Sequence, residues 1–193
     1  ERGNFILSKG HASIIQYVIL EDKKILKKKM LDSYCKKHGI LGVHPDIGNP
    51  GINASTGSLG HGLALSAGMA LAEKKNIIYT LLSDGELQEG STWEAVIAIG
   101  ALKLNNIVVL IDNNNLQSFE FTSNSHKNLY PIYQKYKSFG WDAVTCNGNG
   151  EAQYDGSCIC NIDYIGLTDC KYITSKGWVN NQLAKELSSP QDI

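Results

Sequence analysis

Two polar sequences follow neighbouring apolar runs, and both carry side chains that bind hard cations. Asp84 and Gly85 follow the apolar run 76–83, and Asp112 with three asparagines (113–115) follows the run 107–111. Carboxylate and carboxamide oxygens suit Mg²⁺ or Ca²⁺, and sparsely held Mg²⁺ completes its shell with phosphate oxygens and water. The pattern therefore predicts a site for a metal-bound diphosphate. The same residue types are also common in turns, which is a competing interpretation of the pattern alone.

The elements around these sequences place them together. The runs 76–83 and 107–111 have the composition of buried strands, and the segment from Ser91 to Leu104 between them is expected to be a helix. A strand–helix–strand unit of this length has parallel strands, whose carboxyl ends lie side by side. Ligands of open α/β sheets bind at that edge. We therefore expect an α/β fold with a parallel sheet.

The rest of the chain is expected to be mainly helical, with one long irregular segment from His38 to Ser55. Irregular segments of that length inside a domain tend to be functional. A helix from Thr56 contains several glycines, which indicates close approach of its backbone to a ligand or a neighbouring element. The expected helices span 11–22, 27–37, 56–74 and 130–139, and a strand is expected over 141–146.

Composition excludes several classes of protein. With 193 residues and 42% hydrophobic content, the chain can bury one domain-sized core. Its net charge of −1 provides no excess of positive charge for binding nucleic acid or an anionic membrane. We find neither an apolar run long enough to span a bilayer nor a signal peptide. Five cysteines, an odd number, favour a reducing compartment, so a cytoplasmic location is expected.

Several short motifs occur in the order found in one family of enzymes. The Asp84-Gly-Glu-Leu-Gln-Glu-Gly motif and the later Asp112-Asn-Asn-Asn-Leu motif resemble the signature that binds thiamine diphosphate. Together with the other motifs they resemble transketolases, most closely the short type whose N-terminal half is a separate polypeptide. The other motifs are Phe5-Ile-Leu-Ser-Lys-Gly-His, His44-Pro-Asp, Ser55-Thr-Gly-Ser-Leu-Gly and Phe139-Gly-Trp.

The resemblance covers residues 2–149 and implies the thiamine diphosphate-binding fold, with helices on both faces of the parallel sheet. We therefore expect a cofactor- and metal-binding domain over 1–149 that lacks the family's N-terminal segment. Residues 150–193 are unassigned, although 172–178 match the family's last strand and loop weakly.

The resemblance also implies a set of ligands for the metal and the cofactor. Asp84, the side chain of Asn114 and the main-chain carbonyl of Leu116 are the expected metal ligands, with Asn113 as the alternative asparagine. Gly85 would offer its N–H to the diphosphate. The expected cofactor-binding residues are His11, Gly57, Leu59, Asp84, Gly85, Glu86 and Asn114.

The implied catalytic residues are His11, His44 and Glu89. By resemblance, His11 lies near the diphosphate, His44 near the hydroxyls of the donor sugar, and Glu89 in a network at an interface between subunits. Glu94 has two interpretations, because it fits the same network and also completes a capping box with Ser91.

The implied reaction transfers a two-carbon ketol unit from a ketose phosphate to an aldose phosphate. It requires a partner with a pyrimidine-binding domain, or a C-terminal transketolase subunit, in a homodimer or heterotetramer. Ser83, Val43 and His61 depart from the family pattern. These departures favour the alternative, a non-catalytic paralogue that binds a partner. Deoxyxylulose-phosphate synthase is a more distant alternative, and the motif from Ser55 to Gly60 argues against it.

Overall fold

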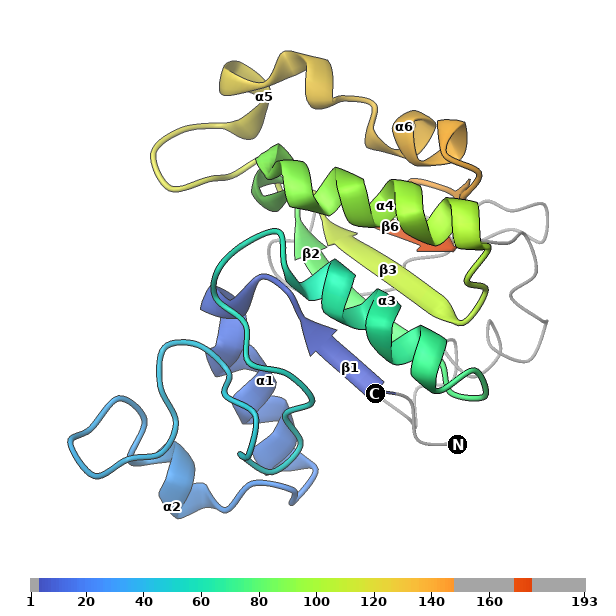
Figure 1. Ribbon diagram of the computed structural model, residues 1–193. Coiled ribbons are helices and arrows are strands. Elements are labelled where there is room, and N and C mark those ends of the chain that lie inside the picture. The colour runs from blue at the N-terminus through green and yellow to red at the C-terminus, as the bar shows by residue number, and fades with distance from the viewer. Residues whose placement is uncertain (1–3, 148–168, 175–193) are drawn as a thin grey trace.

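A computed structural model describes residues 4–147 and 169–174 (Figure 1). The expected domain boundary between residues 149 and 150 lies outside these ranges. Of the weakly matched segment 172–178, residues 172–174 lie in a strand and residues 175–178 are outside the described ranges.

The centre of the fold is a sheet whose first three strands are parallel. They are β1 (Asn4–Leu7), β2 (Ile78–Ser83) and β3 (Ile107–Asp112). The expected strand–helix–strand unit is therefore confirmed. β6 (Asp169–Thr174) runs antiparallel to β3, and the short strands β4 (Asp142–Ala143) and β5 (Cys146–Asn147) pair with β6. The order is β1-β2-β3-β6-β4, with β5 beside β6.

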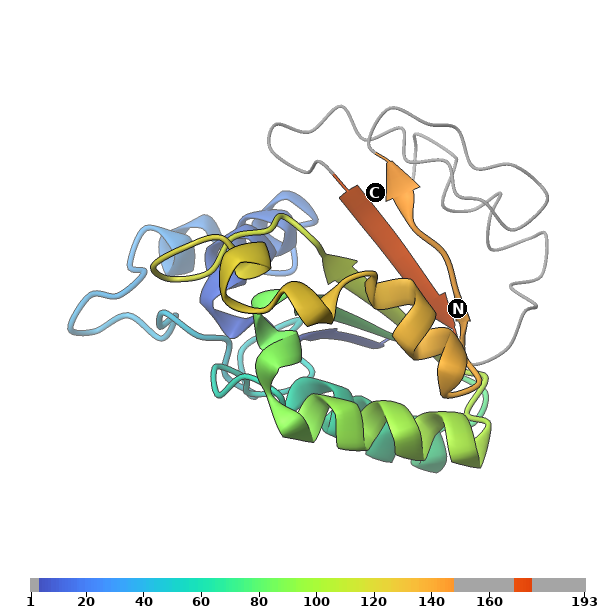
Figure 2. The ribbon, with the colours of Figure 1, turned by 90° about the horizontal axis from the view of Figure 1, so that it is seen from above.

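Two helices cover one face of this sheet. They are α3 (Gly62–Ala72) and α4 (Gly90–Leu102), which pack against each other and lie on the same side of the strands (Figure 2). α1 (Ser13–Asp22) and α2 (Lys28–Leu31) lie on the side away from α3 and α4, near the end of β1. This arrangement bears out the expected α/β class. None of the helices among the described residues is long and apolar enough to cross a bilayer.

The remaining helices are short and follow β3 or the ends of the other parallel strands. α5 (Thr122–Ser125) and α6 (Ile132–Ser138) come after β3 in the chain, joined by a 3₁₀ turn η3 (Lys127–Leu129). Two further 3₁₀ turns, η1 (Gly10–Ala12) and η2 (Gly85–Gln88), lie just beyond the ends of β1 and β2.

Three expected elements are shorter than the sequence indicated. The helix expected from Thr56 begins at Gly62, because Gly57 and Gly60 have φ angles of +145° and +87° that an α-helix excludes. The helix expected to reach Lys37 ends at Leu31, and Cys35 has a positive φ of 54°. The strand expected over 141–146 is reduced to the two short strands β4 and β5.

The predicted capping box at Ser91 is wrong. α4 begins at Gly90, so Ser91 already lies inside the helix, and Glu89 is the N-cap residue without a side-chain capping bond. Because Ser91 is not the N-cap residue, Glu94 does not occupy the N3 position of a capping box, and its side chain is exposed.

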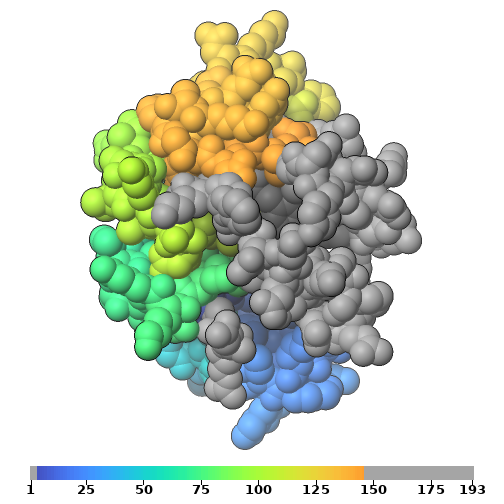
Figure 3. All heavy atoms as spheres, turned by 90° about the vertical axis from the view of Figure 1, so that its right-hand side faces the viewer, coloured from blue at the N-terminus to red at the C-terminus, as the bar shows by residue number. Residues whose placement is uncertain are grey.

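The main core lies between the sheet and the helices α3, α4 and α6. Its fully buried side chains include Leu63, Leu82, Val96, Val109 and Ile132. Figure 3 shows α3 and α4 next to each other along one side of the molecule, with α6 above α4. A second, smaller cluster packs α1 against the irregular segment before α3 and contains Tyr17, Leu20, Leu26, Leu41 and Ile52. This second cluster holds the irregular segment in place.

Candidate active site

The three parallel strands bring their carboxyl ends to one edge, as the sequence predicted. Ser83 lies opposite Asp112 in the register of β2 and β3, and the Asp84 N–H donates to the Asp112 carbonyl at 3.1 Å. β1 ends alongside them, where the Ser8 N–H donates to the Leu81 carbonyl at 2.9 Å. Ser8, Asp84 and Asp112 are thus neighbours at this edge although they are far apart in sequence.

Asp84 is a buried carboxylate held by three donors. Its relative exposure is 0%. Oδ1 accepts from the Gly85 N–H at 2.9 Å, whereas Oδ2 accepts from both the Asn115 N–H and the Tyr130 hydroxyl, each at 2.9 Å. The Gly85 N–H, expected to face a diphosphate, is therefore used for Asp84. No cationic side chain in the described part of the chain forms an ion pair with Asp84.

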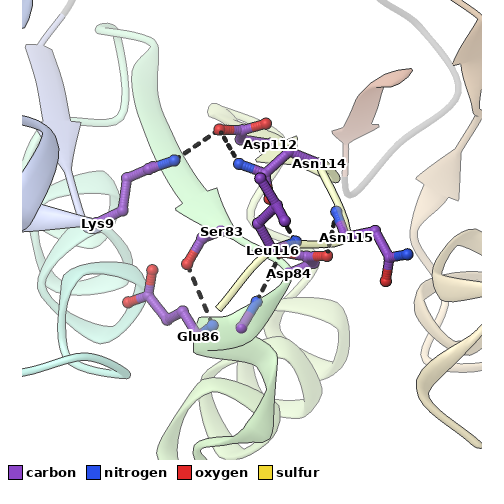
Figure 4. Close-up of polar contacts among 9 residues, drawn as sticks. Lys9, Ser83, Asp84, Glu86, Asp112, Asn114, Asn115 and Leu116 are labelled. Carbon is purple, nitrogen blue, oxygen red and sulfur yellow. Dashed lines mark hydrogen bonds and ion pairs between the residues drawn. The ribbon is translucent and has the colours of Figure 1, made fainter. Parts of the chain in front are cut away.

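Asn114 and Leu116 lie beside Asp84 (Figure 4). Asn114 Oδ1 accepts from the Leu116 N–H at 2.9 Å, and its Nδ2 donates to Asp112 Oδ2 at 3.3 Å. A Cβ added to Gly85 would lie 4.0 Å from the Leu116 carbonyl oxygen. The structure therefore brings the three expected metal ligands to the same edge, with a Cβ at Gly85 at ordinary contact distance from the Leu116 carbonyl.

These residues fit a hard divalent cation. Asp84 Oδ1 and Asn114 Oδ1 each accept one hydrogen bond, from Gly85 and Leu116 respectively, which leaves further acceptor capacity on both oxygens. Within 4–147 and 169–174 there is no cluster of three His, Cys, Asp or Glu side chains that could hold a metal. A site of one carboxylate, one carboxamide and one carbonyl suits Mg²⁺, which commonly takes few protein ligands.

Asn113 differs from Asn114 in its surroundings. Its side chain is 7% exposed, and Oδ1 is buried without a hydrogen-bond partner among the described residues. Asn114 is half-buried and shares hydrogen bonds with Asp112 and Leu116. Asn114 stays the predicted ligand, because it is hydrogen-bonded to Leu116, another of the expected ligands, and Asn113 stays the alternative.

Lys9, to which the sequence motifs gave no role, forms an ion pair at this edge. Its Nζ lies 2.6 Å from Asp112 Oδ2, and the two side chains are only 10% and 13% exposed (Figure 4). The signal in the sequence was the position of Lys9 just after β1, at the same edge as the acidic end of β3. The pair gives Asp112 a cationic partner, whereas Asp84 has none among the described residues.

Glu86 is buried and ties three segments together. Its Oε1 accepts from the Ser8 hydroxyl and, at 2.8 Å, from the Gly60 N–H, while its own N–H donates to Ser83 Oγ at 3.2 Å. Burial raises the pKa of Glu86, and the hydrogen bonds from Ser8 and Gly60 oppose that shift. Glu86 thus holds the loop before α3 against the strand ends, and its predicted contact with the cofactor stays a prediction.

His44 and Gly10, the residue before His11, both lie against the glycine loop at Gly57. A Cβ added to Gly57 would lie 2.7 Å from His44 Cγ, and one added to Gly10 would lie 2.7 Å from the Gly57 nitrogen. Partial burial lowers the pKa of His11, and electrostatic repulsion from Lys9 and His44 lowers it further. His11 is therefore a neutral imidazole at neutral pH.

α1 positions the segment that carries His44. The Tyr17 hydroxyl donates to the His44 carbonyl at 2.8 Å, and the Ser13 hydroxyl donates to the Val43 carbonyl at 2.5 Å. The side chains of Val43 and His44 are both exposed, so the departure at Val43 displaces no core residue.

The loop that carries Gly57 and Leu59 borders an open hollow of about 620 Å³. Leu59 is half-buried, and Glu89 is exposed with its Cβ against Gly60. A larger hollow of about 800 Å³, between α4 and the segment 124–139, contains none of the predicted site residues. The smaller hollow is lined by Ser55, Thr56, Ser58, His61, Ala64 and Leu65.

The departure at Ser83 leaves the strand end intact. Ser83 ends β2 with no positive φ, so this position does not need the conformational freedom of glycine. Its hydroxyl oxygen accepts the Glu86 N–H, which helps begin the turn after Asp84. One reason to favour a degenerate site is therefore removed.

Tyr130 is the other residue that the sequence did not identify. Burial raises its pKa, and the hydrogen bond to Asp84 and the charge of Asp84 raise it further, so the hydroxyl retains its proton and acts as a donor. Nothing in the sequence around Tyr130 marks it as a partner of a residue at the end of β2.

Comparison with known proteins gives the same assignment as the motifs. The model of the transketolase, thiamine diphosphate binding domain family matches residues 1–159. One subunit of an apulose-4-phosphate transketolase from Phocaeicola vulgatus is 39% identical over 153 residues, which are 77% of this chain and 54% of the relative. A 6-deoxy-6-sulfo-D-fructose transketolase subunit from a Clostridium species is 34% identical over 154 residues, 77% of this chain and 56% of the relative.

Solved structures agree with the sequence comparison. The transketolase from Leishmania mexicana superposes with a TM-score of 0.71 at 28% identity, covering 80% of this chain and 25% of that one. The chain spans about half the length of the two curated relatives. The chain therefore belongs to the transketolase family and carries its thiamine diphosphate-binding domain.

Proposed function

We propose that this chain is the diphosphate-binding part of a transketolase that transfers a two-carbon ketol unit from a ketose phosphate to an aldose phosphate. Family membership supports the class of reaction. The two relatives are named for different sugars, apulose-4-phosphate and 6-deoxy-6-sulfo-D-fructose. The proposal therefore specifies the class of donor and acceptor, and not one sugar.

The observation that carries this proposal is the fully buried Asp84 carboxylate, which has no cationic partner among the described side chains. Buried charges in proteins are paired or coordinate metals. Asn114 and the Leu116 carbonyl would complete the protein's share of a Mg²⁺ or Ca²⁺ site. Thiamine diphosphate, when bound, supplies the stabilised carbanion chemistry that breaks and forms carbon–carbon bonds.

The other residues of the chain would orient the cofactor and the substrate. His11 is neutral, so it would act as a hydrogen-bonding group beside the diphosphate without adding a charge. Gly57 and Leu59 would present main-chain groups to the aminopyrimidine, and Glu86 would keep their loop in place through Gly60. His44 would contact the hydroxyls of the donor sugar.

Calorimetric titration of thiamine diphosphate with Mg²⁺ into the purified chain tests the site. Asp84→Ala should abolish metal-dependent binding, because it removes the anionic ligand. Asn114→Ala should weaken binding strongly and Asn113→Ala much less. Asp142→Ala is a matched control, since Asp142 is an exposed carboxylate on β4. Unchanged binding by Asp84→Ala would reject the site, and the reverse ranking of the asparagines would shift the ligand to Asn113.

We further propose that a pyrimidine-binding domain or a C-terminal transketolase subunit completes the active site, in a homodimer or heterotetramer. The relatives are named as subunits, which supports a partner chain. α3 and α4 expose Leu65, Leu71, Ile97 and Leu102 at 45–57%, which offers an apolar surface for such a partner. Leu87, which lies in η2 just before α4, is 1% exposed and belongs to the main core, so it is not part of this surface.

Measurements of activity and of assembly distinguish a catalytic transketolase subunit from a non-catalytic paralogue. The chain alone should show no ketol transfer, and addition of its partner should restore it; turnover by the homogeneous chain alone would reject this view. Light scattering should show self-association across micromolar concentrations, whereas a stable monomer would count against the interface. Binding of a partner without binding of the cofactor would favour the non-catalytic paralogue.

A further inference from the structure

The segment that follows β3 returns to Asp84 at two points. Asn115 has a left-handed backbone with φ of 59°, and its N–H donates to Asp84 Oδ2. The same residue binds the start of α5, because its carbonyl accepts the Thr122 N–H at 3.1 Å and its Oδ1 accepts the Ser123 N–H at 2.8 Å. The second point is Tyr130, whose hydroxyl reaches the same carboxylate oxygen at 2.9 Å.

Tyr130 is fixed between two buried neighbours. Leu129 is 8% exposed and Ile132 is 0% exposed, and both belong to the main core. The Tyr130 N–H also donates to the Lys127 carbonyl at 3.3 Å. Packing of the segment between η3 and α6 therefore fixes the position of Tyr130 and with it the direction of its hydroxyl.

We propose that Tyr130 is a positioning residue for the metal ligand Asp84. This inference rests on the metal site in the proposed function. Two donors converge on Oδ2, so they hold the plane of the carboxylate and leave Oδ1, with its single donor, oriented for coordination. Partners that orient a ligating group commonly change metal affinity about 10- to 100-fold when removed. Because the Asn115 donor remains, we expect a loss near the lower end of that range, about tenfold.

The test is a titration of Mn²⁺ into the full chain in the presence of thiamine diphosphate, with free Mn²⁺ measured by electron paramagnetic resonance. Tyr130→Phe removes only the hydroxyl and should raise the Mn²⁺ dissociation constant about tenfold. At saturating Mn²⁺, the dissociation constant for thiamine diphosphate should return to the wild-type value. A change in the Mn²⁺ constant alone is specific to a metal-positioning role, because general damage to the domain would weaken the binding of both Mn²⁺ and thiamine diphosphate.

Tyr133→Phe is the matched control, because Tyr133 lies in α6 and its hydroxyl accepts a hydrogen bond from the exposed Gln134. This control should leave both constants unchanged. Equal constants for Tyr130→Phe and wild type would overturn the inference, even if urea unfolding showed lower stability, because Tyr130 would then only anchor its segment. Equal losses in both tyrosine variants would overturn it as well. Failure of the wild-type chain to bind Mn²⁺ would instead reject the underlying metal site.

Discussion

The Lys9 ammonium lies 2.6 Å from Asp112 Oδ2, and this ion pair joins a residue just beyond the end of β1 to the last residue of β3. β2 lies between those two strands in the sheet. The pair therefore crosses above the end of β2, directly beside the turn that carries Asp84. It stabilises the edge of the sheet and also offsets the charge of the Asp112 carboxylate.

Lys9→Met is expected to lower the free energy of unfolding by about 3 kcal/mol, because it leaves the mostly buried Asp112 carboxylate without its partner. Urea unfolding in EDTA measures this loss. The double variant Lys9→Met/Asp112→Leu should lose much less than the sum of the single variants. Lys74→Met, at an exposed position, is the control. A loss below about 0.5 kcal/mol for Lys9→Met would show that the pair behaves as a solvent-exposed one.

Glu86 should make the protein less stable as the pH rises above the ordinary carboxyl pKa of 4.5. Burial raises its pKa in the folded state, so the folded state binds more protons than the unfolded state between the two values. The stability contribution of Glu86 is complete below pH 4.5 and is lost as the pH rises through the folded pKa.

Glu86→Gln keeps an oxygen for Ser8 and Gly60 but cannot ionise, so it should remove this loss. We expect the variant to be more stable than wild type at about pH 7.5 and similar to it at about pH 4. Urea unfolding in EDTA at both pH values measures the difference, with exposed Glu94→Gln as the control. A variant less stable than wild type at the higher pH would contradict the sign.

Tyr136→Phe is expected to leave the stability unchanged or to raise it by up to about 1 kcal/mol, because the Tyr136 hydroxyl is buried without a hydrogen-bond partner in the described residues. The ring packs against Trp93 and Trp141 at centroid distances of 5.6 and 5.4 Å, and Phe preserves both contacts. Tyr136→Ala should instead cost about 3–5 kcal/mol. Thermal and urea unfolding distinguish the two, and a clear loss for Tyr136→Phe would reveal a partner for the hydroxyl.

Gly57→Ala and Gly68→Ala should have opposite effects. Gly57 has φ of +145° and faces the ring of His44, so an alanine there should cost at least about 1 kcal/mol and displace that histidine. Gly68 lies inside α3 with nothing within 4 Å of an added Cβ, so alanine should stabilise the helix by about 0.5–1 kcal/mol. Chemical unfolding gives both values, and calorimetry should show weaker cofactor binding only for Gly57→Ala. Equal signs for the two substitutions would contradict this interpretation.

The sequence alone determined the centre of this fold and the edge at which the site lies. Two apolar runs and the helix between them require neighbouring parallel strands, and Asp84 and Asp112 stand at the ends of those runs. These features follow from local composition and connection length, which act over a few tens of residues. The motifs containing Asp84, Asn114 and Leu116 could therefore be grouped before any contact was known.

The tertiary structure decided which side chains meet at that edge. Lys9 pairs with Asp112 across an intervening strand, and the Tyr130 hydroxyl reaches Asp84 from a segment 46 residues away in sequence. It also decided that the glycine-rich helix begins only at Gly62, since the backbone before it bends around Glu86 and His44. Such contacts depend on how separate segments pack in three dimensions, and neither periodicity nor residue type encodes that packing locally.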